Sequence, residues 1–248
     1  MRVLILGGTT EASALARAVA GDARIEATLS YAGRTRTPAR LPIPTRSGGF
    51  GGVQGLAHHL RAQAIDALVD ATHPFAAQMS RHAAEAAALA GVRLLAIVRP
   101  PWQPQAGDCW TAVPDMENAA AALGPVPRRV FLTVGQQELA AFAAAPWHDY
   151  LIRSVEPVTR LPPRARCIVA RGPFEEEGER RLLQTERIEL LVTKNSGGAA
   201  TSAKLTGARA LGIPVIMVSR PLAEAVPSVL DAAGALAWLR HRAADLGE

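Results

Sequence analysis

The strongest constraint on the fold is an internal repeat in this 248-residue chain. An apolar run followed by a glycine turn opens each half, and further segments match in the same order. Each half also closes with an apolar run that ends in Arg-Pro. The matched pairs are Arg2–Ala12 with Arg129–Leu139, Ile65–Pro74 with Ile188–Gly197, and Ile97–Pro100 with Val218–Pro221.

Strand-like runs alternate with Ala-rich helical segments in both halves, which is typical of parallel sheets built from right-handed βαβ crossovers. We therefore expect an α/β protein with two Rossmann-like parallel-sheet domains, residues 1–125 and 126–248, and a ligand cleft between them. The Pro-rich segment Pro100–Arg128 is expected to hold a helix over Met116–Leu123 and the passage between the halves. Residues Ser228–Arg242 are expected to form a closing amphipathic helix.

The first turn carries a nucleotide-binding signal. The run Arg2–Leu6 leads directly into Gly7, Gly8, Thr9 and Thr10. Glycine lets the backbone approach a pyrophosphate, and the next helix offers free N–H groups and the positive end of its dipole. The full G-x-G-x-x-G spacing is missing, so an ordinary tight strand-to-helix turn is the alternative.

The end of the second expected strand, Ile25–Leu29, favours NADP over NAD. An NAD site places a carboxylate near this position to bind the ribose 2′-hydroxyl. Here the chain has Ser30, with Arg34 and Arg36 shortly after it, and no carboxylate. A guanidinium pairs well with a 2′-phosphate. The alternative is that both arginines belong to an ordinary surface loop.

Two polar loops follow later strands of the expected sheets. Thr72 and His73 follow the first, where they are candidates for the nicotinamide pocket, and His73 is a candidate general acid or a structural hydrogen-bonding group. The second loop holds the chain's only two lysines and is a candidate anion site or a capped helix start. Its candidate residues are Lys194, Asn195, Ser196, Gly197, Gly198 and Lys204.

Composition excludes several other classes. The net charge of +5 comes from dispersed arginines without interleaved aromatic residues, which favours an anionic small molecule over nucleic acid. No apolar stretch approaches the length of a membrane helix, and no signal peptide is visible. Cys109 and Cys167 stand far apart in sequence, and the histidines show no metal spacing. We expect a cytoplasmic protein without a metal site.

Three segments together resemble the precorrin-6A reductase family of cobalamin biosynthesis. They are Ile5–Ala12, Asp70–Ala76 and Thr193–Val215, and the resemblance covers nearly the whole chain. It implies NADPH-dependent reduction of the C18–C19 double bond of precorrin-6A, a polycarboxylate tetrapyrrole, to give precorrin-6B. It also implies transient contact with other corrin-pathway enzymes.

The resemblance implies roles for the candidate residues. Gly7, Gly8, Thr9 and Thr10 would bind the pyrophosphate, Ser30 and Arg34 the 2′-phosphate, and Thr72 the nicotinamide. His73, Lys194, Asn195 and Ser196 are the catalytic candidates. Gly197 and Gly198 would contact the cofactor or substrate, and Lys204 would bind a phosphate or a substrate carboxylate. The alternatives are an NADP-dependent reductase of another anionic substrate, a non-catalytic NADP-binding sensor, and a methyltransferase, which explains neither Arg34 nor the repeated half.

Overall fold

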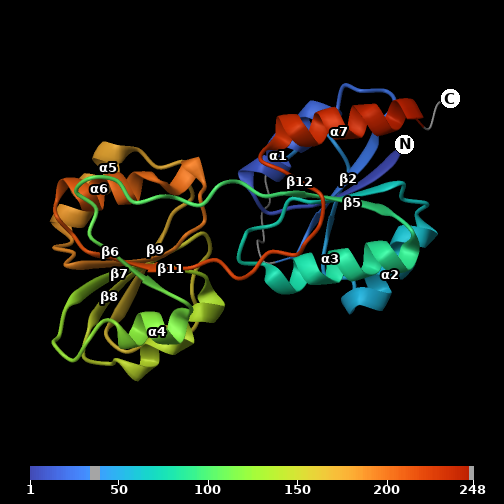
Figure 1. Ribbon diagram of the computed structural model, residues 1–248. Coiled ribbons are helices and arrows are strands. Elements are labelled where there is room, and N and C mark those ends of the chain that lie inside the picture. Colours follow the sequence, from blue (N-terminus) through green and yellow to red (C-terminus); the bar gives the residue numbers. More distant parts are fainter. Residues whose placement is uncertain (34–39, 246–248) are drawn as a thin grey trace. The chain divides into compact units, whose positions relative to one another are not determined.

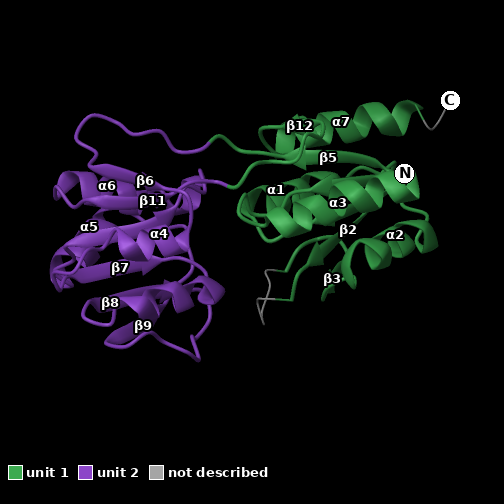
Figure 2. Ribbon diagram, turned by 60° about the horizontal axis from the view of Figure 1, so that its bottom comes forward, with its two compact units in different colours: residues 1–100, 221–248 green, residues 101–220 purple. Residues whose placement is uncertain are grey.

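The computed structural model describes residues 1–33 and 40–245 and divides the chain into two compact units (Figure 2). Unit 1 comprises residues Met1–Pro100 and Pro221–Glu248, and unit 2 comprises Pro101–Arg220. Each unit contains one six-stranded sheet in which the neighbouring strands pair in parallel. The predicted α/β class and the two Rossmann-like sheets are thereby confirmed.

Unit 1 has the strand order β12-β5-β4-β1-β2-β3. Counted along the chain, this is the 3-2-1-4-5-6 order of a Rossmann sheet. Its elements are β1 (Arg2–Leu6), α1 (Thr10–Val19), β2 (Glu26–Tyr31), β3 (Thr45–Ser47), α2 (Gly52–Ala62), β4 (Ala67–Asp70), α3 (Ala77–Ala90), β5 (Arg93–Ile97), β12 (Ser228–Val229) and α7 (Ala232–Asp245).

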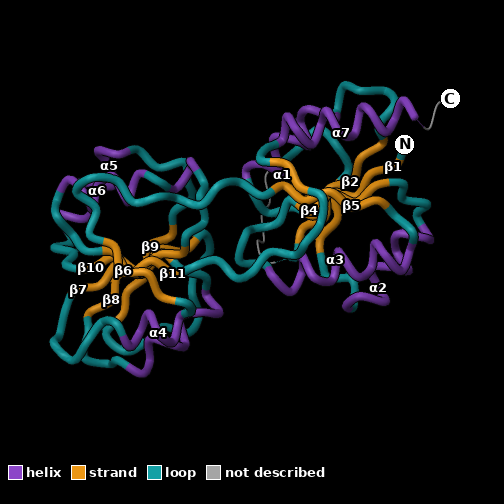
Figure 3. Tube along the Cα trace, in the orientation of Figure 1, coloured by secondary structure: helices purple, strands orange, loops and turns teal. Residues whose placement is uncertain are grey.

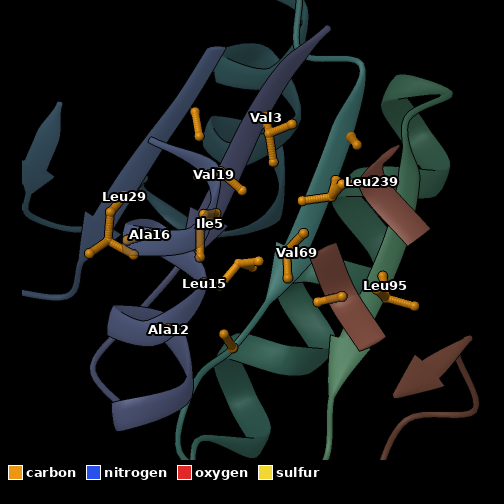
Figure 4. Packing of buried hydrophobic residues seen from close by; sticks show 14 of the residues in the cluster. Val3, Ile5, Ala12, Leu15, Ala16, Val19, Leu29, Val69, Leu95 and Leu239 are labelled. Atoms are coloured by element: carbon orange, nitrogen blue, oxygen red, sulfur yellow. The ribbon is translucent and has the colours of Figure 1, made fainter. Parts of the chain in front are cut away.

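Helices cover both faces of the unit 1 sheet because its strands are apolar on both sides. In β1, Val3 and Ile5 pack toward α1 and α7, whereas Leu4 and Leu6 pack toward α2 and α3. Figure 4 shows the first of these two layers, with Leu15 of α1 and Leu239 of α7 against the sheet. The sheet is therefore a central layer that holds the ends of its strands in fixed positions.

Unit 2 repeats this architecture with the order β6-β11-β10-β7-β8-β9. Helices α5 and α6 lie on one face, and α4 with η1 lies on the other (Figures 1 and 3). Its elements are β6 (Trp110–Val113), α4 (Met116–Ala121), β7 (Arg129–Thr133), η1 (Gln136–Ala144), β8 (Asp149–Ser154), β9 (Ala165–Val169), α5 (Glu176–Thr185), β10 (Leu190–Lys194), η2 (Ala199–Thr201), α6 (Ala203–Ala210) and β11 (Val215–Val218). The helix after its glycine turn, η1, is a 3₁₀-helix.

The two repeats exchange their last strands. After β5 the chain leaves unit 1, and β6 pairs with β11 of unit 2, where Trp110 lies opposite Val215. After β11 the chain returns, and β12 pairs with β5 of unit 1, where Ser228 lies opposite Ala96. The units therefore differ from the predicted domains 1–125 and 126–248, whose boundary follows the repeat and not the exchanged strands.

Two local expectations change with this exchange. Ser228 and Val229 form an edge strand, so the predicted closing helix over Ser228–Arg242 begins only at Ala232. The predicted passage between the halves contains strand β6 besides the predicted helix, which ends at Ala121 as α4. Strands β6 and β12 are short and pair with segments that are distant in sequence, so local periodicity does not identify them.

Candidate functional site

The first glycine turn of unit 1 has an open backbone at the end of β1. Gly8 has φ +116°, a conformation that side chains disfavour, and a Cβ placed there would meet no atom within 4 Å. A Cβ on Gly7 would come 2.7 Å from Leu29 Cδ1, so glycine permits close packing against β2. The two glycines thus differ in their surroundings: the backbone is open at Gly8 and packed against β2 at Gly7.

The side chain of Thr9 ties this turn to the loop after β4. Thr9 Oγ1 donates to the carbonyl of Ala71 at 2.7 Å and accepts from Ala12 N at 3.1 Å, which caps α1. Asp70 is buried and accepts hydrogen bonds from Thr72 N at 3.0 Å and Thr72 Oγ1 at 2.7 Å. The loops after β1 and β4 are therefore held together at the point where the strand order of the sheet reverses, which is where ligands of such sheets bind.

A backbone hydrogen bond defines the tautomer of His73, the residue after Thr72. Its Nδ1 accepts a hydrogen bond from Phe75 N at 3.2 Å, so the neutral ring carries its proton on Nε2. The ring lies 5.8 Å from that of Phe75, centroid to centroid. His73 thus belongs to the same strand-end loop as Thr72.

Arg46 is a cation of this unit that the sequence interpretation missed. Its Nη1 donates to Ser30 Oγ at 2.7 Å and to the carbonyl of Gly48 at 3.2 Å, and its guanidinium lies 3.9 Å from the Phe50 ring centroid. Burial lowers the pKa of Arg46 below its ordinary value, although a guanidinium stays charged. The predicted Arg34 lies outside the described residues. The signal that could have found Arg46 is its position just before the glycine-rich stretch 48–52.

The aligned turn of unit 2 is closed by a carboxylate of the chain itself. Gly135 N donates to Glu138 Oε2 at 2.5 Å, and the same carboxylate binds Lys194 Nζ at 2.9 Å through both oxygens. In unit 1 the aligned Glu11 instead pairs with Arg99 at 2.5 Å. An internal carboxylate thus uses the N–H of unit 2 that a phosphate would need, which leaves unit 1 as the candidate nucleotide unit.

Asn195 holds the segment that enters unit 2. Its Oδ1 accepts from Trp102 N at 2.7 Å, and its Nδ2 donates to the carbonyl of Trp102 at 3.0 Å. Arg220 Nε donates to the Asn195 carbonyl at 2.8 Å. Both ends of the Asn195 amide are thereby engaged with backbone, so its geometry is that of a positioning residue.

The rest of this loop lies at the carboxyl end of β10. Ser196 is buried, and its N–H donates to the Lys194 carbonyl at 2.7 Å. Gly197 adopts φ +69°, and Gly198 precedes η2. Lys204 lies in the first turn of α6 and is buried.

The candidate residues therefore fall into two groups. Gly7, Gly8, Thr9, Thr10, Ser30, Thr72 and His73 lie in unit 1, whereas Lys194, Asn195, Ser196, Gly197, Gly198 and Lys204 lie in unit 2. Within residues 1–33 and 40–245, no three His, Cys, Asp or Glu side chains are grouped so that they could hold a metal ion, and no helix has the length and apolar character needed to cross a membrane.

Comparison with known proteins gives the family. The family model described as precorrin-6x reductase CbiJ/CobK matches residues 2–240. The precorrin-6A reductase of Rhodobacter capsulatus is 51% identical over 98% of this chain and 97% of its own length. The precorrin-6A reductase of a Sinorhizobium species is 51% identical over 97% of this chain and 93% of its own.

A solved structure supports the same relationship. The structure titled CobK precorrin-6A reductase has a TM-score of 0.92 and 51% identity, and the match covers 97% of this chain and 96% of that one. The sequence match and the structural match thus both extend over both units. The chain belongs to the precorrin-6x reductase family.

Proposed function

We propose that this protein reduces precorrin-6A to precorrin-6B in cobalamin biosynthesis, with NADPH as the reductant. The observation that carries the proposal is the 51% identity to precorrin-6A reductases over nearly the whole length of both chains. Both relatives are named for the cobalt-free compound, and we extend the proposal to that form of the substrate. A cytoplasmic location and transient contact with other enzymes of the pathway remain predictions.

The turn after β1 fits a dinucleotide. A Cβ at Gly8 would meet only open space, and α1 begins directly after the turn with Thr9 as its cap. The proposal assigns the pyrophosphate to Gly7, Gly8, Thr9 and Thr10, whose backbone carries the N–H groups of the helix start. Since both hydrogen-bonding functions of the Thr9 hydroxyl are used within the chain, the Thr9 backbone is the part that contacts phosphate.

Arg46 and Ser30 support a preference for NADPH over NADH. The two side chains meet where β2 and β3 pair, next to the turn proposed to bind the nucleotide. Together Arg46 and Ser30 carry one positive charge and no carboxylate. A guanidinium favours a 2′-phosphate by both charge and geometry. We assign the 2′-phosphate to Ser30, Arg46 and Arg34.

Bound NADPH supplies the hydride, and the protein supplies position. Thr72, fixed by Asp70, and His73 are the proposed neighbours of the nicotinamide, because their loop adjoins the glycine turn at the sheet edge. Lys194 and Ser196 are the proposed substrate contacts from unit 2, and Asn195 positions their loop. Holding the reacting atoms in a near-attack geometry accounts for several kcal/mol of the barrier in such reactions.

The test is nucleotide oxidation with enzymatically prepared precorrin-6A. The proposal predicts substrate-dependent loss of absorbance at ~340 nm with NADPH, a much slower reaction with NADH, and a product that has gained two hydrogens by mass spectrometry. Cobalt-precorrin-6A serves as the matched alternative substrate. Tight NADPH binding without turnover on either compound would instead indicate a sensor, and turnover only with a different anionic compound would indicate another reductase.

A further inference from the structure

One glutamate of the internal repeat has different partners in the two units. Glu138 follows the glycine of its turn, Gly135, by three residues, and Glu11 stands at the aligned position of unit 1. In unit 2, Glu138 turns back and accepts the hydrogen bond of Gly135 N at 2.5 Å. In unit 1, Glu11 Oε2 instead lies 2.5 Å from Arg99 Nη1. The repeat therefore contains a closed and an open form of the same turn.

The space beside each glycine shows this difference. A Cβ placed on Gly135 would lie 2.9 Å from Glu138 Oε2 and 3.8 Å from Lys194 Nζ, so side chains fill that turn. A Cβ placed on Gly8, the aligned glycine, would meet no atom of the described residues within 4 Å. The backbones differ as well, with φ −74° at Gly135 and φ +116° at Gly8. The turn of unit 1 is thus open where the turn of unit 2 is occupied.

Different cations hold the two carboxylates. Lys194 ends β10 and binds both oxygens of Glu138 at 2.9 Å, which keeps that carboxylate at its turn. The residue of unit 1 aligned with Lys194 is Ala71, which offers no cation. Arg99, two residues after β5, takes the carboxylate of Glu11. The Arg99 and Glu11 side chains are only 12% and 20% exposed, so solvent screens this ion pair weakly.

A carboxylate at position 11 competes with a bound pyrophosphate. Glu11 lies in the first turn of α1, where the positive end of the helix dipole favours a carboxylate as well as a phosphate. An uncompensated carboxylate there would repel the nucleotide. A carboxylate that closed on the turn would use an N–H group that the phosphate needs. Arg99 opposes both effects, because it neutralises the charge of Glu11 and holds its side chain.

We propose that Arg99 is a positioning residue for the nucleotide, and that it keeps the turn after β1 open by holding the Glu11 carboxylate. This inference rests on the proposed function, because it takes that turn as the pyrophosphate site. Arg99 acts through Glu11 and not by contact with the phosphate. Without Arg99, the carboxylate stays uncompensated beside the turn or closes it, as Glu138 does in unit 2.

Nucleotide binding by single variants tests the first part of the proposal. Dissociation constants are measured by calorimetry for NADPH, NADH and adenosine 2′-phosphate, the last of which carries no pyrophosphate. Arg99→Met is expected to weaken the binding of NADPH and NADH by the same factor, about 10-fold or more, and to change that of adenosine 2′-phosphate less than about twofold. Glu11→Gln is expected to bind all three at least as tightly as the wild type.

The double variant tests whether Arg99 acts through Glu11. Arg99→Met combined with Glu11→Gln is expected to bind NADPH and NADH within about threefold of the wild type, because the carboxylate that Arg99 restrains is gone. Arg93→Met is the matched control, since Arg93 is exposed at the other end of β5 and its loss removes the same charge. Its three dissociation constants are expected to match those of the wild type.

The outcomes separate this inference from the proposed function. If the wild type binds NADPH and Arg99→Met binds it as tightly, the role of Arg99 is wrong and the proposed function stands. If the double variant stays as weak as Arg99→Met, or if Arg99→Met weakens adenosine 2′-phosphate equally, Arg99 does not act through Glu11 and the inference is wrong. If the wild type binds neither NADPH nor NADH, the proposed function and this inference are both wrong. Should Arg99→Met fail to fold, Arg99→Gln replaces it in the same cycle.

Discussion

Replacing Lys204 by methionine is predicted to stabilise the folded protein. The Lys204 residue is 4% exposed and its Nζ lies 5.4 Å from the Trp102 ring centroid, with no hydrogen bond or ion pair to a carboxylate given for this ammonium among the described residues, whereas a methionine side chain of similar length carries no charge. Removal of a buried uncompensated charge relieves its desolvation cost. The free energy of unfolding of the variant is therefore expected to exceed that of the wild type.

The size of this stabilisation and its pH dependence follow from the pKa of Lys204. Its pKa is about 7 in the folded state and close to the ordinary 10.5 when unfolded, so the unfolded chain binds the extra proton between these values. The charge therefore destabilises the wild type fully below pH 7, and the penalty fades as the pH rises toward 10.5. At about 1.4 kcal/mol per pH unit, the full penalty is on the order of 5 kcal/mol.

Urea unfolding of wild type and Lys204→Met at pH 6.5 and pH 9.5 measures this effect. The variant is expected to be more stable at both pH values, and its advantage is expected to shrink by roughly 3 kcal/mol at the higher pH. Arg181→Met is expected to show no such pH dependence, since its side chain is exposed. A methionine variant that is less stable than the wild type, or an advantage that is the same at both pH values, would refute the reasoning.

Three further predictions concern Arg46, Gly8 and the buried ion pair of Glu179 with Arg153. Arg46→Met is expected to raise the KM for NADPH at least about 10-fold more than the KM for NADH, because only NADPH carries the 2′-phosphate; equal increases in steady-state assays would remove Arg46 from that site. Gly8→Val is expected to abolish NADPH binding in a fluorescence titration, since φ +116° suits glycine and the side chain would fill the open turn; unchanged affinity would exclude this turn. Glu179→Gln leaves Arg153 buried and uncompensated and is expected to cost about 3–5 kcal/mol in urea unfolding, whereas a loss below about 1 kcal/mol would contradict the buried-pair description.

The central strands of both sheets could be predicted from the sequence because their signals are local. Apolar runs followed by glycine turns or polar loops identified the central strands, and the repeat indicated that both halves share one topology. The exchange of β6 and β12 could not be predicted in this way. Ser228 and Val229 pair with β5 across more than half of the chain, and nothing in a two-residue strand indicates a partner so distant.

The candidate site shows the same division. Gly7, Gly8 and Thr72 follow apolar strands, so their sequence position indicates the ligand edge of a parallel sheet. Arg46 reaches Ser30 only because β3 pairs with β2. Glu179 follows the acidic run Glu175–Glu177, a pattern typical of a solvated helix face, yet the Glu179 side chain is buried against Arg153. Such contacts depend on the tertiary fold, and a single sequence does not reveal them.

The central claim is hydride transfer from NADPH to precorrin-6A by this protein. The most direct test is a single-turnover reaction with NADPH that carries deuterium at nicotinamide C4, followed by mass spectrometry of the tetrapyrrole. We predict that one of the two deuterated epimers gives precorrin-6B one mass unit heavier than the product from unlabelled NADPH. NADPH oxidation without deuterium in the tetrapyrrole from either epimer would contradict the account.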